Sequence, residues 1–190
     1  FKPEFHVGNT QYTITSKENS FNLFIKNASV ESPSHTIGFS VFDGVKWTEI
    51  SGHKTIDEKW HHVMAFVNGS KITLYVDGNL EGEQTLQNKF SIGDNGKYLI
   101  ENSQVLNSDS DIVVGAYVNT LREDLKTYNK FVGKIGTVDV YTGVVTEEQV
   151  NYKYQTELPK VPDKYVSLYE TMQIGDQTNL LYEFNINDES

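Results

Sequence analysis

The sequence predicts an all-β sandwich, and three observations point to that fold class. Aromatic residues make up 12% of the 190 residues, with 11 Tyr and 10 Phe, which suits half-buried pleated surfaces. Short alternating or β-branched runs recur at intervals of about eight to twelve residues. Gly, Asn and Asp separate these runs, as turns require. A chain of this length fits one sandwich domain.

Seven runs are expected to form strands. In chain order they cover residues 11–17, 20–27, 35–44, 60–69, 70–79, 111–118 and 131–141. Asn68-Gly69 and Asp77-Gly78 are hairpin signals, because Gly accepts the positive φ of tight primed turns. Strands 62–67 and 71–76 are therefore expected to pair antiparallel.

Alternation within 71–76 separates two faces of that strand. Ile72, Leu74 and Val76 are expected to face the core, whereas Lys71, Thr73 and Tyr75 are expected on a wetter face.

One short helix is expected near 146–156. Thr146 can cap its exposed amides, and Glu147 and Glu148 lie at the positive end of its dipole. The polar stretch 84–111 is interpreted as a loop-dominated insertion, and 158–178, which holds two of the four prolines, as a connector.

Composition excludes several classes of function. The formal net charge of −10 disfavours binding to nucleic acid or anionic lipid. No apolar run reaches the ~20 residues of a membrane span. The chain has no Cys, so disulfides and thiolate metal sites are absent.

The run "IDEKWHHVMAFVNGSKITLYVDGNLEG" resembles the central hairpin of laminin-G-like modules in the concanavalin A-like lectin/glucanase superfamily. "YTITSKENSFNLFI" upstream and "DIVVGAYV" and "NKFVGKIGTVDVYTGVVTEEQV" downstream are similar to the flanks of that hairpin. The resemblance implies a jelly-roll β-sandwich of two antiparallel sheets, one of them concave. His61 and His62 are adjacent in a predicted strand, so their side chains point to opposite faces and cannot bind one metal ion together. Both are therefore expected to have structural roles.

The two ends of the chain suggest a division into three parts. "FKPEF" resembles the end of a family strand, so the N-terminal strands of a laminin-G-like sandwich over 1–157 are expected to be missing. Residues 179–190 resemble an opening strand of such a module. We expect this segment to complete the sandwich or to open a next module, with Leu180 to Ile186 paired as a strand. Unpaired strand edges invite pairing with another chain.

Candidate ligand-binding residues are those that could stack on a sugar ring or bond to its hydroxyls. They are Trp47, Tyr117, Asn119 and Arg122. The metal candidates are Asp94, Asp109 and Asp111, whose oxygens suit calcium. A structural calcium ion is the one cofactor that the sequence suggests. In the family's closing strand, where a carboxylate is usual, this chain has Gly136 and Thr137.

Two functions follow from these observations. The first is a non-catalytic module of a secreted or surface protein that binds a glycan or glycoprotein. The alternative is a structural or adhesive module of a larger extracellular or virion assembly. Its partners would be neighbouring subunits that exchange strands with it. Glycoside hydrolysis needs two facing carboxylates, and the Glu-x-Asp-x-x-Glu strand of related glucanases does not occur. The sequence therefore predicts no enzymatic activity.

Overall fold

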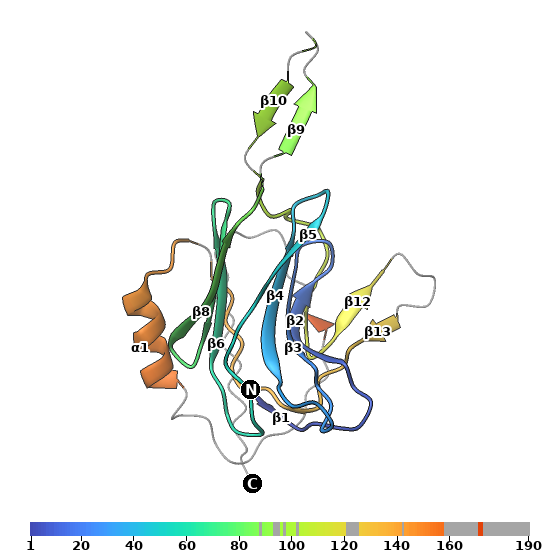
Figure 1. Ribbon diagram of the computed structural model, residues 1–190, viewed down its shortest axis with the longest axis vertical. Helices are drawn as coiled ribbons and strands as arrows, with labels where there is room; N and C mark the ends of the chain where they lie inside the picture. Colours follow the sequence, from blue (N-terminus) through green and yellow to red (C-terminus); the bar gives the residue numbers. More distant parts are fainter. Residues whose placement is uncertain are drawn as a thin grey trace.

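The computed structural model describes residues 1–87, 89–92, 96, 98–101, 103–120, 126–141, 143–157 and 171–172. These residues form a sandwich of two antiparallel sheets with one helix beside it (Figure 1). In spatial order the six-stranded sheet contains β15 (Thr171–Met172), β11 (Ile112–Val114), β2 (Gln11–Lys17), β3 (Phe21–Lys26), β4 (Thr36–Phe42) and β5 (Trp47–Ser51). The three-stranded sheet contains β6 (Val63–Asn68), β7 (Lys71–Val76) and β8 (Asn79–Thr85). The predicted fold class, a jelly-roll β-sandwich, is confirmed.

Three two-stranded pairs complete the described strands. They are β1 (Lys2–Pro3) with β14 (Gly133–Lys134), β9 (Lys89–Ile92) with β10 (Tyr98–Glu101), and β12 (Tyr117–Asn119) with β13 (Lys126–Tyr128). The β9–β10 hairpin projects from one end of the sandwich (Figure 1). It lies inside the stretch 84–111, so the expectation of a loop-dominated insertion is wrong for these eight residues.

The predicted central hairpin is confirmed. β6 pairs antiparallel with β7 from Val63 opposite Val76 to Asn68 opposite Lys71. The turn into β8 consists of Asp77 and Gly78, with φ angles of 48° and 76°. Two consecutive positive φ angles are those of a type I′ turn, which matches the twist of the strands that it joins.

The core lies between the two sheets. Ile72 and Leu74 are fully buried and Val76 is 1% exposed, as the alternation predicts. They belong to one apolar cluster with residues of the larger sheet, among them Ile25, Ile37 and Val41. β5 lies against β8 at one side of the sandwich, because the Glu81 carboxylate accepts the N–H groups of His53 and Lys54, which follow β5.

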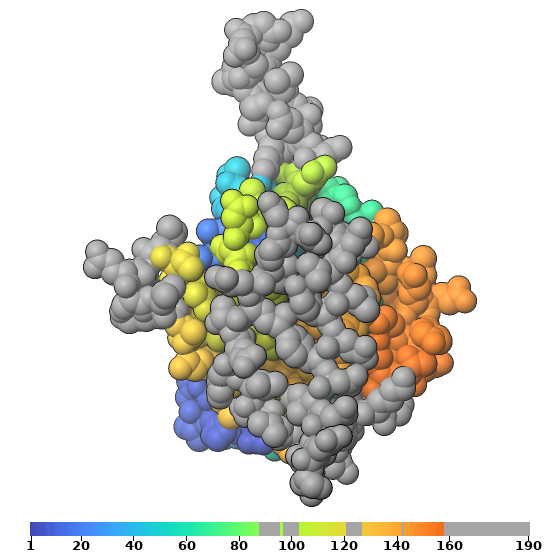
Figure 2. Space-filling model, turned by 180° about the vertical axis from the view of Figure 1, so that it is seen from behind, coloured from blue at the N-terminus to red at the C-terminus, as the bar shows by residue number. Residues whose placement is uncertain are grey.

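The helix α1 (Glu147–Glu157) is confirmed close to its predicted bounds. Its start is a capping box, in which the Gln149 side chain accepts the Thr146 N–H at 2.8 Å and the Thr146 hydroxyl accepts the Gln149 N–H at 3.3 Å. The helix lies beside the outer face of the three-stranded sheet (Figure 1). Figure 2 shows it from behind, with α1 and β12–β13 on opposite flanks of the molecule.

The face of β7 expected to be wet is exposed at Lys71 but buried at its other two residues. Thr73 is 4% and Tyr75 7% exposed, although both point away from the core. α1 lies over this side of the sheet, where the ring of Tyr154 contacts the backbone of Gly78. Alternation in a strand reveals two faces but cannot show that a distant helix covers the second.

The two downstream strands are shorter than predicted. The run 111–118 is divided at Gly115, whose φ is +80°, into β11 and the start of β12. In 131–141 only Gly133–Lys134 is a strand, and it pairs with β1 for two residues. Alternation alone is insufficient there, since a strand needs a ladder partner and no described strand pairs with residues 135–141. Residues 180–186 lie outside the described residues.

Candidate ligand-binding face

The outer face of the six-stranded sheet is the face turned away from the core. Phe39 and Val41 of β4 point into the core, so the residues between and after them point outward. The pairing of β4 with β5 extends this outer face to β5. It places Trp47 opposite Phe42, Glu49 opposite Ser40 and Ser51 opposite Gly38.

Trp47 supplies an exposed aromatic surface on this face. Its side chain is 41% exposed, and its ring lies 5.3 Å from the ring of Phe42 at 35°. Phe42 is half-buried and supports one side of the indole. The open part of the indole can stack against a flat apolar ligand surface, such as one face of a sugar ring.

Charged and polar groups lie on the same outer face as Trp47. Lys26 and Glu49 form an ion pair, and Lys26 Nζ also donates to Ser51 Oγ at 3.2 Å. The side chains of Lys26 and Glu49 are 38% and 39% exposed, so water screens this pair and its contribution to stability is small. Both groups remain accessible for hydrogen bonds to a ligand.

A polar row leads inward from Glu49. Ser40 lies opposite Glu49, and Asn22 of β3 lies opposite Ser40. Asn22 is 8% exposed and its Oδ1 has no hydrogen-bond partner among the described residues. An unpartnered buried acceptor costs about 1–3 kcal/mol, which a donor on a ligand or a water would recover.

The other predicted ligand residues lie elsewhere. Tyr117 and Asn119 are on β12, which lies beside β2 and outside the six-stranded sheet. Burial and the nearby Glu18 carboxylate raise the pKa of Tyr117. Three strand spacings, about 14 Å, separate β2 from β5, so the structure does not bring these residues to Trp47. Arg122 lies outside the described residues.

The predicted metal ligands are only partly described. Asp109 is exposed and Asp111 half-buried, while Asp94 lies outside the described residues. Within the described ranges, no group of three or more His, Cys, Asp or Glu side chains is placed to hold a metal ion.

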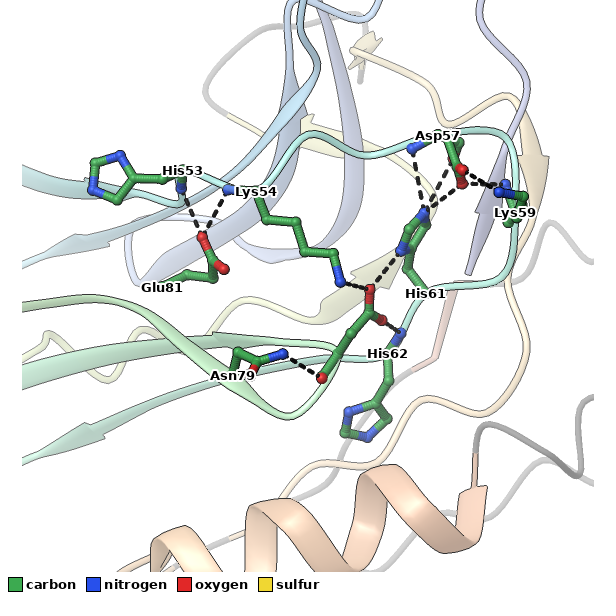
Figure 3. A network of polar contacts seen from close by, with 9 residues as sticks. His53, Lys54, Asp57, Lys59, His61, His62, Asn79 and Glu81 are labelled. Atoms are coloured by element: carbon green, nitrogen blue, oxygen red, sulfur yellow. Dashed lines mark hydrogen bonds and ion pairs between the residues drawn. The ribbon is translucent and has the colours of Figure 1, made fainter.

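Figure 3 shows a second polar cluster, which includes Lys54, His61 and His62. All three contact Asp77, which lies in the β7–β8 turn. Asp77 Oδ2 accepts hydrogen bonds from Lys54 Nζ at 2.7 Å and from His61 Nδ1 at 2.8 Å. Its Oδ1 accepts the backbone N–H of His62 at 2.8 Å. Burial raises the pKa of Asp77, but these three donors outweigh it and hold that pKa below its usual value.

The cluster has a structural role. The second ring nitrogen of His61, Nε2, accepts the Asp57 N–H at 3.3 Å, so both nitrogens are engaged and neither is available as a catalytic base. The network instead ties the connection between β5 and β6 to the β7–β8 turn (Figure 3). This agrees with the structural role expected for His61.

His62 points to the opposite side, where it contacts α1. Its Nε2 lies 3.5 Å from a Glu157 oxygen, and its ring lies 6.0 Å from that of Tyr154. Nδ1 is buried and unpartnered among the described residues. Burial lowers the pKa of His62, although Glu157 opposes the shift.

A pH dependence of stability follows from His62. Below its unfolded pKa of 6.5 the unfolded chain binds more protons than the folded one, so stability falls as the pH drops from about 7 to 5. In His62→Gln the side chain stays neutral, and the difference in Tm between pH 7 and pH 5 becomes smaller than in the wild type. An unchanged difference would mean that His62 does not carry this dependence.

The fold described above is that of a β-sandwich module with one exposed aromatic edge. Residues 1–117, more than half of the chain, match the model of the concanavalin A-like lectin/glucanases superfamily. The chain therefore belongs to that superfamily. None of the curated proteins compared with the chain matches it.

Sequence reasoning singled out Trp47 but missed Glu49 and Asn22. Glu49 could have been found, because a residue two positions after Trp47 in a strand shares its face. Asn22 could not, since its place on this face depends on the pairing of β3 with β4.

Proposed function

We propose that this module binds a glycan or glycoprotein through the outer face of its larger sheet at β5. The observation that carries the proposal is the exposed indole of Trp47, which shares one face with Glu49 and Lys26. Membership of a superfamily that includes lectins supports the same function. The indole stacks on a sugar ring, and the charged pair bonds to its hydroxyls.

A glycan-array screen of the wild-type chain, with and without a chelator, tests the proposal. For the glycan bound best, Trp47→Ala weakens binding about tenfold or more, because a central aromatic anchor typically contributes over 1 kcal/mol. Isothermal titration calorimetry measures the change. Tyr152→Ala is the matched control, since Tyr152 is a 67% exposed aromatic on α1, outside the proposed face.

Two results would reject this function. One is the absence of binding across the array. The other is equal loss of binding in Trp47→Ala and Tyr152→Ala, which would place the site elsewhere.

We propose further that the module is non-catalytic. The superfamily also includes glucanases, whose chemistry needs an acid and a nucleophile or base on facing carboxylates. On the proposed face Glu49 is paired with Lys26, and the residue opposite it on β4 is Ser40 and not a second carboxylate. Prolonged incubation with the bound glycan yields no shortened products by mass spectrometry.

A secreted or cell-surface location is part of the same proposal, since glycans and glycoproteins are displayed outside the cell. No described helix is long and apolar enough to span a membrane. Structural calcium at Asp109 and Asp111 stays a prediction, and the chelator arm of the screen tests it.

The second candidate function is that of a structural module in a larger assembly whose subunits exchange strands. One observation favours it: β6, at the edge of the three-stranded sheet, has a strand partner on one side alone among the described strands.

A further inference from the structure

The turn between β6 and β7 contains the acceptor motif for N-linked glycosylation. Asn68, Gly69 and Ser70 fit the pattern Asn-x-Ser/Thr, with a residue other than Pro in the middle. The modification attaches an oligosaccharide to the side-chain nitrogen of Asn in surface loops of secreted proteins. Because so short a pattern also arises by chance, the surroundings of Asn68 decide whether it is meaningful.

The turn presents the Asn68 side chain to solvent. Asn68 is the last residue of β6 and is exposed. Gly69 has a φ of 60° and Ser70 has no positive φ, so the two-residue loop is a type II′ turn. Within the part of the chain that the structure describes, the Asn68 side chain makes no hydrogen bond. A Cβ placed on Gly69 would meet no atom within 4 Å, so the space around the turn is open.

The turn also lies away from the helix that covers the rest of this face. In Figure 1 it is at the end of the sandwich from which the β9–β10 hairpin projects, beyond the end of α1. The contacts of α1 with the sheet are at the other end, where Tyr154 lies against Gly78 and Glu157 lies 3.5 Å from His62. An oligosaccharide on Asn68 therefore does not displace α1.

An aromatic side chain lies next to Asn68 on the same face. Val67 packs against the core, so its neighbours Phe66 and Asn68 both point outward, about 7 Å apart. The ring of Phe66 stacks on that of Tyr75 at 5.9 Å and 16°. Tyr75 lies opposite Met64, so it covers the side of Phe66 that is farther from Asn68. Phe66 is half-buried, which leaves part of its ring in contact with solvent.

We propose that Asn68 is N-glycosylated and that the first sugar of its oligosaccharide packs on the ring of Phe66. In the reaction, Asn68 Nδ2 attacks the anomeric carbon of an oligosaccharide carried on a polyprenyl diphosphate. A C–N bond forms and Nδ2 loses one proton. The bond between the anomeric carbon and the diphosphate oxygen breaks, and the lipid diphosphate leaves with that electron pair. The apolar face of the attached sugar then covers ring surface that water contacts in the unmodified chain.

The other match to the motif in the sequence lacks this arrangement. It consists of Asn27, Ala28 and Ser29. The residue two positions before Asn27 is Ile25, which is fully buried in the core, so no aromatic surface lies beside the acceptor. The Ser29 hydroxyl also has a structural role, because it accepts the backbone N–H groups of Gly8 and Glu31, each at 3.3 Å. The structure therefore favours Asn68 as the site where a glycan stabilises the fold.

The full chain, secreted from cultured animal cells, tests whether Asn68 is occupied. An amidase that releases N-linked glycans in heavy-oxygen water converts each glycosylated Asn to a labelled Asp, which peptide mass spectrometry locates. We expect the label at position 68 in the wild type and its absence in Ser70→Ala, which keeps Asn68 but removes the hydroxyl of the motif. An unlabelled position 68 in the wild type would overturn the proposal. This inference rests on the secreted location proposed above and not on the Trp47 face, so the glycan-array result does not affect it.

A four-chain comparison tests the contact with Phe66. We expect the Tm of the secreted wild type to exceed that of Ser70→Ala by about 2–4 °C, the shift that one aromatic contact gives in a chain of this size. In Phe66→Leu, the same Ser70→Ala change leaves the Tm unaltered. Asn27 is present in all four chains, so a glycan there cancels from the comparison.

The same four chains produced in a bacterial cytoplasm, where this modification does not take place, give the effect of Ser70→Ala itself, which is subtracted. After this subtraction, an equal effect of the glycan on Tm with Phe66 and with Leu at that position would overturn the stacking of the sugar on the ring. A lower Tm for the glycosylated wild type would overturn it as well.

Discussion

Replacing Asp77 with Asn lowers the free energy of unfolding by about 3–5 kcal/mol, the cost typical of breaking a buried ion pair from one side. Asp77 is 8% exposed and accepts three hydrogen bonds, two of them from Lys54 and His61. The amide of Asn offers one acceptor in place of two and carries no charge. Asn tolerates the φ of 48° at this position, so the loss reports the contacts and not backbone strain.

Urea denaturation followed by far-UV circular dichroism measures the change. Asp57→Asn is the matched control, because Asp57 contacts the other ring nitrogen of His61 but its side chain is 51% exposed. We expect its effect to stay below about 1 kcal/mol. If Asp77→Asn lost no more stability than Asp57→Asn, the network would not hold the β5–β6 connection to the β7–β8 turn.

The parts of the fold that could be predicted are those specified by neighbouring residues. The run 11–17 is β2 residue for residue. β6 and β7 pair antiparallel as predicted, although their turn consists of Gly69 and Ser70, one residue later than the Asn68-Gly69 signal. The helix follows from Thr146 and the carboxylates after it, since capping is a contact within one turn. In each case the deciding interactions span a few residues.

The parts that could not be predicted depend on distant partners. Tyr75 is buried on the side of its sheet that lies beside α1, about 75 residues further along the chain. Residues 135–141 have no described ladder partner despite their alternation. The candidate site has the same limitation. Trp47 and Glu49 share a face by local alternation, but only the pairing of β3 with β4 and of β4 with β5 adds Asn22 to them.

Leu74→Ala lowers the free energy of unfolding by about 2–5 kcal/mol, since truncating a buried Leu loses transfer free energy and leaves a cavity. Leu74 is fully buried at the centre of β7, between β6 and β8. It packs in the cluster that joins the two sheets. Chemical denaturation gives the value, with the m-value checked for a change in the extent of unfolding.

Leu80→Ala is the matched control for this substitution. Leu80 lies on the neighbouring strand β8 and is 52% exposed, so the same change of atoms leaves no closed cavity. We expect a loss below about 1 kcal/mol at this position. Similar losses at Leu74 and Leu80 would contradict the inward face assigned to β7. They would also contradict the sandwich, because the face formed by Ile72, Leu74 and Val76 is what joins the hairpin to the larger sheet.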